Sequence, residues 1–193
     1  MDAIQTVDLQ KSDPSDQTEG PAWARALLKG LQEHGFVRVV GHDIPQSQIL
    51  RAREAFERFF ELPDAEKNLC GGSDGGQRGF TPFGLEHARD QTSPDQKEFF
   101  HIGQADPPSD PPAGTYSPNI WPESIPELRE AGLVLYRSLE DTASRLLQGL
   151  ALACQLPAGT FSDMIKSGNS ILRAVHYPPL QEGAPSGSMR AAP

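Results

Sequence analysis

The chain contains few cysteines and no long hydrophobic run. Only two cysteines occur in its 193 residues, Cys70 in a glycine-rich loop and Cys154 in an apolar helical stretch. Two free thiols in a reducing cytoplasm are therefore expected, with a disulfide between them as the alternative. No apolar run approaches the roughly 20 residues of a membrane helix, and the first residues lack the basic and apolar regions of a signal peptide. These absences predict a cytoplasmic protein that does not enter a membrane.

A positively charged surface is also missing. The net charge is -9 and no cluster of basic residues offsets it, so binding to nucleic acid or to an anionic membrane is not expected. Hydrophobic residues make up 37% of the chain, and its 18 glycines and 18 prolines gather in loops. This composition is typical of a loop-rich α+β protein, long enough for one domain or one large fragment with a core.

The histidines do not form a metal-binding motif. A non-haem iron site needs two histidines and a carboxylate, and its local form on a strand is His-x-Asp or His-x-Glu, because a period of two puts both side chains on one face. None of the five histidines is followed by Asp or Glu two residues later. His34, His42 and His87 are expected to be surface or capping residues. His101 and His176 lie on predicted strands and are candidates to line a cavity.

Motifs for nucleophilic catalysis and phosphate binding are absent as well. The chain has no Gly-x-Ser-x-Gly elbow and no P-loop, and the glycine-rich run from Gly71 to Gly76 lacks the lysine that phosphate binding requires. The adjacent carboxylates Glu140 and Asp141 are neighbours in a predicted helix, so they do not face one reacting atom. No catalytic residue is therefore expected in these 193 residues.

Apolar spacing and strand-forming residues predict alternating helices and strands. Helices are expected from Pro21 to Gly35, from Pro45 to Leu62, from Pro126 to Pro157 and from Phe161 to Ile165. The longest presents one apolar face over about eight turns, formed by Leu128, Leu135, Tyr136, Leu139, Ala143, Leu146, Leu147, Leu150 and Cys154. Strands are expected at residues 4–9, 36–40, 79–80, 97–101 and 170–177, where β-branched and aromatic residues dominate.

The strand at residues 170–177 is the last predicted element. Its alternation puts one set of side chains on each face: Ile171, Arg173, Val175 and Tyr177 on one, and Leu172, Ala174 and His176 on the other. A strand needs partners, and little sequence follows to supply them. The sheet is therefore expected to be incomplete.

Three constrained groupings precede this strand and suit either packing or the lining of a pocket: residues 77–86, 95–100 and 119–122. Together with other segments they resemble the isopenicillin N synthase-like family of iron- and 2-oxoglutarate-dependent oxygenases. The resemblance rests on Ile4–Leu9, Gly35–Pro45, Arg78–Glu86, Lys97–Phe99, Asn119–Pro122 and Leu172–Pro179, in this order and spacing.

The resemblance implies a fold and a division of the chain. The fold is α+β, with an N-terminal helix and strand region that leads into a double-stranded β-helix, or jelly roll, truncated here. Residues 4–122 would form the non-haem dioxygenase N-terminal region. Residues 123–193 would supply a long helix, a short helix and the first strand leading to the absent iron- and 2-oxoglutarate-binding jelly roll.

The resemblance also implies a function for the complete protein. The family binds iron with His-x-Asp and a later His, and 2-oxoglutarate with Arg-x-Ser, and these follow a segment like Ser188–Pro193, so the reading frame is expected to continue with His-x-Asp or His-x-Glu. The complete member would use Fe(II) and 2-oxoglutarate to oxidise a small-molecule substrate, as a monomer, although some relatives do not use 2-oxoglutarate. The chain alone would bind neither cofactor and would be inactive. The alternatives are a non-catalytic remnant that acts as a binding module and an unrelated α+β protein.

Four residues are implied in the pocket. The hydroxyl of Tyr177 would bond a carboxylate of cosubstrate or substrate, with a buried core tyrosine as the alternative. Arg173 shares its face and would line the pocket, or else lie on the surface. Arg78 and Phe80 would belong to the lid or rim. Trp121 is expected in the core.

Overall fold

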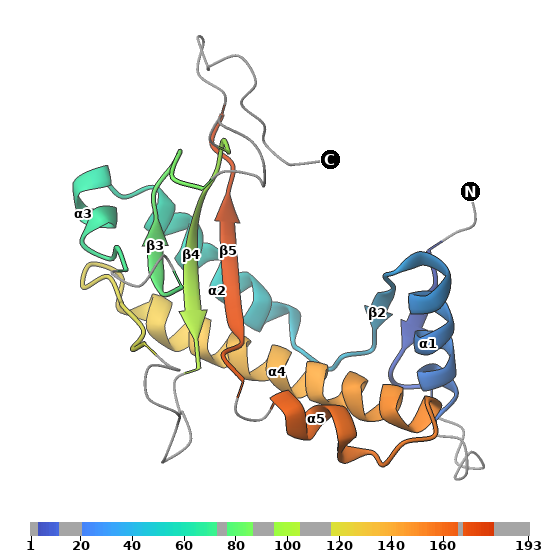
Figure 1. Cartoon of the computed structure of the whole chain (residues 1–193). Coiled ribbons are helices and arrows are strands. Elements are labelled where there is room, and N and C mark those ends of the chain that lie inside the picture. The colour runs from blue at the N-terminus through green and yellow to red at the C-terminus, as the bar shows by residue number, and fades with distance from the viewer. Residues whose placement is uncertain are drawn as a thin grey trace. The chain divides into compact units, whose positions relative to one another are not determined.

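The computed structural model describes most of the chain, namely residues 4–11, 21–72, 77–86, 95–104, 117–165 and 168–179. The predictions for His87, for the segment Ser188–Pro193 and for part of the loop Gly71–Gly76 concern residues outside these ranges. Helices and strands alternate along the chain (Figure 1), which confirms the α+β class. Contacts divide it into two compact units, unit 1 with Met1–Gln46 and Arg137–Gly168, and unit 2 with Ser47–Tyr136 and Asn169–Pro193.

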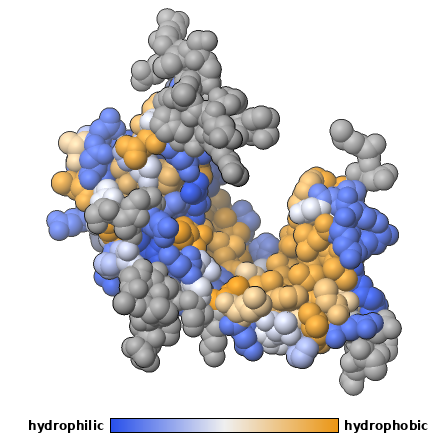
Figure 2. Space-filling view, in the orientation of Figure 1, coloured by the Kyte–Doolittle hydropathy of each residue, from blue (hydrophilic) through white to orange (hydrophobic). Residues whose placement is uncertain are grey.

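Unit 1 is built on a small parallel sheet. Its elements are β1 (Thr6–Asp8), α1 (Ala22–His34), β2 (Arg38–Val40), the second part of α4 (Glu127–Ala153) and α5 (Gly159–Ile165). In the sheet Val7 pairs with Val39. Helix α1 ends where predicted, at Gly35, whose φ of 77° allows its N–H to donate to the Leu31 carbonyl at 3.0 Å. Figure 2 shows α1 hydrophilic along its outer side and hydrophobic toward α4, as an amphipathic helix should be.

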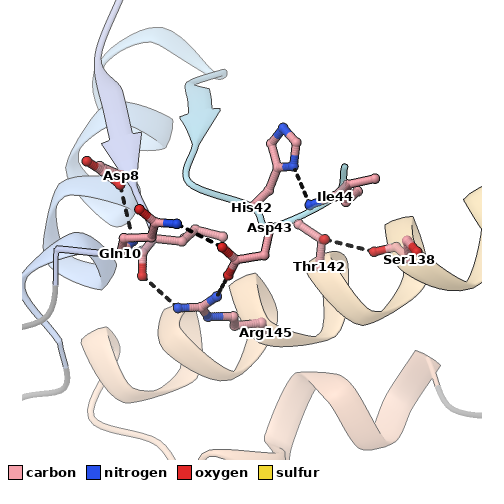
Figure 3. A network of polar contacts seen from close by, with 9 residues as sticks. Asp8, Gln10, His42, Asp43, Ile44, Ser138, Thr142 and Arg145 are labelled. Atoms are coloured by element: carbon pink, nitrogen blue, oxygen red, sulfur yellow. Dashed lines mark hydrogen bonds and ion pairs between the residues drawn. The ribbon is translucent and has the colours of Figure 1, made fainter. Parts of the chain in front are cut away.

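A polar network connects β1, the turn after β2 and α4 (Figure 3). The Arg145 guanidinium donates to the Leu9 carbonyl at 2.6 Å and pairs with the Asp43 carboxylate at 3.5 Å, and Gln10 donates to the same carboxylate at 2.8 Å. Asp43 has a φ of 60°, which costs a residue with a Cβ about 1–2 kcal/mol. His42 Nδ1 accepts the Ile44 N–H at 3.1 Å, so this histidine caps the turn, as predicted. The network thus holds a strained turn in place.

Unit 2 is organised around a three-stranded sheet. Its elements are α2 (Gln46–Phe60), α3 (Asp64–Asn68), β3 (Gly79–Thr81), β4 (Glu98–Gly103), β5 (Ile171–His176) and the first part of α4. The strands lie side by side in the order β3-β4-β5, and both pairings are antiparallel (Figure 1). Phe80 pairs with Phe100, and Phe100 pairs with Ala174. One face of the sheet therefore carries a row of apolar side chains.

The apolar face of this sheet packs on α2 and α4. Phe59 lies edge-on to Phe80 and Phe100, with ring centroids 5.5 and 4.8 Å apart, and Phe59 and Phe100 are fully buried. Trp121 packs against this cluster, as predicted. Gly132 of α4 sits against Ile102, where a Cβ would come within 2.4 Å of its side chain. The glycine thus lets α4 approach β4 closely.

One helix was missed from the sequence, and one expectation about the long helix was wrong. Helix α3 was not predicted, because five residues after Pro63 are too few to show an apolar period. The long helix does not bury one continuous face, since Leu139, Ala143 and Cys154 are exposed. The physical reason is that α4 serves two separate cores, one around Leu128 and the other around Trp23 and its neighbours. The predicted strand at residues 36–40 is also shorter, because Phe36 lies outside β2 and is 55% exposed.

The cost of a close backbone approach can be measured at Gly79. Its φ is 70°, and an added Cβ would lie 2.1 Å from the Cys70 carbonyl oxygen. Gly79→Ala should lower the free energy of unfolding by several kcal/mol, because positive-φ strain adds to an overlap with backbone that cannot rotate away. Gly35→Ala is the matched control, since its φ is 77° and nothing lies within 4 Å. Equal losses for the two variants in urea denaturation would contradict the proposed overlap.

Candidate functional site

A cavity of about 650 Å³ lies on the face of the unit 2 sheet that points away from the aromatic core. Its wall includes residues from all three strands and from the loops beside them: Asn68, Gly71, Gly72, Gln77, Phe80, Thr81, Pro82, Leu85, Glu86, Phe99, His101, Ile171 and Arg173. The side chains of Thr81, Phe99 and His101 reach this face because they alternate with those of Phe80 and Phe100. The pairing of distant strands thus builds one continuous wall.

Arg173 is the centre of the polar contacts in this wall. It is the register partner of His101, and its Nε donates to His101 Nε2 at 2.6 Å. The guanidinium also lies over the ring of Phe99, 4.4 Å from its centroid. Because arginine stays protonated and can only donate, Nε2 of His101 must be the acceptor. The contact therefore assigns the neutral imidazole with its proton on Nδ1.

A chain of alternating charges borders the same wall. Arg173 pairs with the Glu86 carboxylate at 3.6 Å, and Lys97 Nζ lies 2.8 Å from both Glu86 and Asp95. Hydrogen bonds to Asp95 and then to Glu86 raise the pKa of Lys97 above its ordinary value. The Asp95 N–H donates to the Glu86 carbonyl, which keeps the two carboxylates together. These two cations and two anions balance one another, so together they add no net charge to this edge of the cavity.

A second polar group is buried on the opposite face of the sheet. Lys67 Nζ lies 2.8 Å from Glu98 Oε2, and His176 Nδ1 lies 2.7 Å from Glu98 Oε1. Burial lowers the pKa of Lys67, but hydrogen bonds to Glu98 and Asp64 outweigh this and raise it above the ordinary value. The His176 ring stacks on Phe60, with centroids 5.1 Å apart. Glu98 thus joins α3, β4 and β5 directly below the cavity wall.

The four predicted pocket residues occupy different surroundings. Arg173 lines the cavity, and Phe80 borders it from β3 while its ring packs in the aromatic core. Arg78 is only 1% exposed; its guanidinium donates to the Gln77 carbonyl and to Asn169, which ties β3 to the segment before β5. Tyr177 follows the end of β5 and is 43% exposed. It is not the buried core tyrosine of the alternative reading, and a role for it in the pocket stays a prediction.

Other wall residues were missed from the sequence. Thr81 and Glu86 fell inside a segment expected only to pack or to line a pocket, and nothing in their spacing singled them out. His101 was a candidate, but its partner Arg173 lies 72 residues along the chain, and only the strand register brings them together. His176 does not point into this cavity; it contacts Glu98 on the other face.

The wall does not fit an iron centre. Nε2 of His101 is occupied by Arg173, and the carboxylates of Glu86 and Asp95 are held by lysine or arginine. Among the described residues, no group of three His, Cys, Asp or Glu side chains is placed to hold a metal ion.

Both thiols are free, and burial raises the pKa of Cys70. None of the helices in the described ranges is long and apolar enough to cross a membrane.

Comparison with known proteins identifies the family. The family model described as non-haem dioxygenase in morphine synthesis, N-terminal, matches residues 4–124. The chain belongs to the non-haem iron- and 2-oxoglutarate-dependent oxygenases. The isopenicillin N synthase-like resemblance is thereby confirmed, and Fe(II) and 2-oxoglutarate are the cofactors of this family.

Individual relatives agree with this assignment. The 2-oxoglutarate-Fe(II) type oxidoreductase hxnY of Emericella nidulans is 31% identical over 83% of this chain and 49% of its own length. The 2-oxoglutarate-dependent dioxygenase ucsF of Acremonium sp is 28% identical over 87% of this chain and 52% of its own. The oxygenase chain thus spans about half the length of these curated relatives.

Solved structures show the same fold. A 2OG-Fe(II) oxygenase family protein from Caulobacter crescentus superposes with a TM-score of 0.81 at 32% identity, covering 95% of this chain and 59% of that one. A full-length Neurospora crassa protein, solved in complex with alpha-KG, gives a TM-score of 0.78 at 24% identity, covering 98% of this chain and 60% of that one. The second likeness concerns the fold alone.

The buried Lys67–Glu98 ion pair is expected to stabilise the sheet that forms the cavity wall, and this can be tested by substitution. Both side chains are less than 10% exposed, at 7% and 6%. Glu98→Gln should lower the free energy of unfolding by about 3–5 kcal/mol, because it leaves a buried ammonium without its main counterion. Glu57→Gln is the control, since the exposed Arg53–Glu57 pair should be worth less than about 1 kcal/mol. A loss for Glu98→Gln no larger than that of the control would contradict this role.

The same pair should give a pH dependence in alkaline solution. The pKa of Lys67 is raised in the folded protein relative to 10.5, so its contribution to stability is present below that value and is lost as the pH rises through the folded pKa. The wild-type chain should therefore lose more stability above about pH 10.5 than Lys67→Met does. Urea denaturation at stepped alkaline pH measures this difference. Parallel pH curves for the two proteins would contradict it.

Proposed function

We propose that these residues form the N-terminal portion of an oxygenase that uses Fe(II) and 2-oxoglutarate to oxidise a small-molecule substrate. The observation that carries the proposal is the cavity wall made by β3, β4 and β5, in a chain whose family carries out this chemistry. In this proposal the wall is one side of the substrate pocket, and the complete enzyme has the jelly roll of its structural neighbours. When bound, the iron would activate molecular oxygen with 2-oxoglutarate as the co-substrate, while the residues described here bind and orient the substrate.

The proposed organisation follows the resemblance. Residues 4–122 are the non-haem dioxygenase N-terminal region, and residues 123–193 lead into the jelly roll. Arg173 contacts the bound molecule, Phe80 belongs to the rim of the pocket, and the hydroxyl of Tyr177 bonds a carboxylate of cosubstrate or substrate. Arg78 supports the rim, which its buried contacts with Gln77 and Asn169 favour. The complete enzyme is proposed to be a cytoplasmic monomer.

The iron ligands in this proposal lie outside these 193 residues. Two observations support that view: none of the five histidines has a carboxylate two residues later, and the acidic groups of the wall are engaged with cations. The chain by itself would then be inactive. An alternative, a non-catalytic binding module, predicts that the chain remains inactive even when the sequence of a relative's iron-binding half is joined to it.

Iron binding and turnover test this proposal. The 193-residue chain, titrated anaerobically with Fe(II), should show no stoichiometric binding, and it should not convert 2-oxoglutarate to succinate. A chimera that continues after β5 with the corresponding half of the Caulobacter crescentus relative should bind one Fe(II) and produce succinate. Tight stoichiometric iron in the isolated chain would overturn the placement of the ligands. A folded chimera that binds iron but never produces succinate would favour the binding module.

The exposed face of β5 gives a second test. Ile171, Val175 and Tyr177 are 38%, 39% and 43% exposed, and β5 has β4 as its only strand neighbour in the described sheet. The isolated chain should therefore bind a hydrophobic dye or self-associate, because unpaired edges and exposed apolar side chains favour both. Ile171→Thr with Val175→Thr should reduce this, measured by light scattering, while Ile4→Thr, at a site 54% exposed in unit 1, should not. A monodisperse wild-type chain that binds no dye would contradict this expectation.

A further inference from the structure

We infer that the cavity recognises an uncharged, planar, hydrogen-bonding group of its ligand, such as a carboxamide or a polar heteroaromatic ring, and discriminates against a carboxylate. Naming this ligand the substrate rests on the proposed function. The preference itself rests on three features of the wall. The buried hydroxyl of Thr81 has no hydrogen-bond partner among the described residues. The edge of the Arg173 guanidinium already contacts His101 and Glu86, and the positive and negative side chains beside the cavity are paired with one another.

Thr81 carries the first part of the inference. Only 6% of the residue is exposed, and its Oγ1 has no hydrogen-bond partner among the described residues. It lies on the cavity face of β3, opposite Phe99 in the register. Buried hydroxyls are nearly always hydrogen-bonded, so one without a partner in a cavity wall marks a place that a ligand atom completes. A hydroxyl both donates and accepts, which suits a neutral amide or ring nitrogen.

Arg173 carries the second part. One face of its guanidinium rests on Phe99, and its edge meets His101 Nε2 and the Glu86 carboxylate. A carboxylate ligand would compete with Glu86 for that edge. The other face of a guanidinium that rests on an aromatic ring is a flat, weakly hydrated surface on which a planar group stacks. The side chain is 42% exposed, which leaves room for such a ligand.

Charge and protonation complete the inference. His101 is held neutral by the hydrogen bond from Arg173, so it adds no positive charge to the wall. Lys97 and Arg173 are each paired with a carboxylate, and Glu86 lies between them. An anion entering here would meet the Glu86 charge while the described cations beside it are already paired. An uncharged group avoids that repulsion.

Binding of a matched pair of probes tests the preference. Benzamide and benzoate have the same size and planarity, but at neutral pH only benzoate is charged. Saturation-transfer NMR on the whole chain, which works equally well if the chain self-associates, should give a dissociation constant for benzamide about tenfold lower than for benzoate, the effect of one hydrogen bond gained or one charge repelled. Thr81→Val should weaken benzamide binding about tenfold, and Thr81→Ser, which keeps the hydroxyl, should restore it. Arg173→Met should weaken benzamide binding, because it removes the flat guanidinium surface on which the planar ring stacks.

Control variants keep the outcomes separate. Thr142→Val in α4 removes a hydroxyl whose bond is to Ser138, and Arg51→Met removes an exposed guanidinium paired with Glu130; neither should change benzamide binding. Benzoate binding as tightly as benzamide, an unchanged Thr81→Val variant, or no saturable benzamide binding would each overturn the inference. Because this measurement needs neither iron nor turnover, an inactive chimera would contradict the oxygenase proposal and leave the measured preference standing.

Discussion

Strand β4 is buried along its whole length. The aromatic core on one face of the unit 2 sheet and the cavity wall on the other both depend on this burial. All six of its residues are buried, although they alternate between two faces with opposite character. One face carries Phe100 and Ile102 into an aromatic core. The other carries Phe99 and His101 into the cavity wall. A buried polar side chain is costly unless it is paired, so the second face requires partners from neighbouring strands and loops.

Polar residues on both faces of β4 find their partners on other elements of the fold. Glu98 and His101 are three residues apart on β4 and lie on opposite faces, yet each is satisfied by a group from another element: Lys67 in one case and Arg173 in the other. The paired residues fix the sheet and the cavity wall together. A change that frees one partner would disturb stability and ligand binding at once, because the same strand supports both.

The sequence was sufficient to predict most helices and strands, but not the contacts that form the cavity wall. Helices α1 and α2 show a helical period bounded by glycine or proline, and both were predicted close to their observed bounds. Strand β5 was predicted with the correct alternation, because Leu172, Ala174 and His176 are more buried than Ile171, Arg173 and Val175. The short helix α3 and the exposed middle of α4 escaped prediction, because their environment is set by contacts with distant segments. The pairing of Arg173 with His101, and the orphaned hydroxyl of Thr81, depend on strand register, which a single strand's pattern does not contain.

The division of α4 between two cores has a consequence for synthesis on the ribosome. Unit 1 combines residues 1–46 with residues 137–168, and β4 cannot pair with β5 until that strand is made, about seventy residues later. Neither core can close until the long helix has emerged from the exit tunnel, so the early segments must remain soluble without their partners. The acidic balance of the chain, with a net charge of -9, would help to keep those nascent segments apart. Strand β5 follows this helix in the chain, so the core of unit 1 can gain its α4 residues before the sheet of unit 2 is complete.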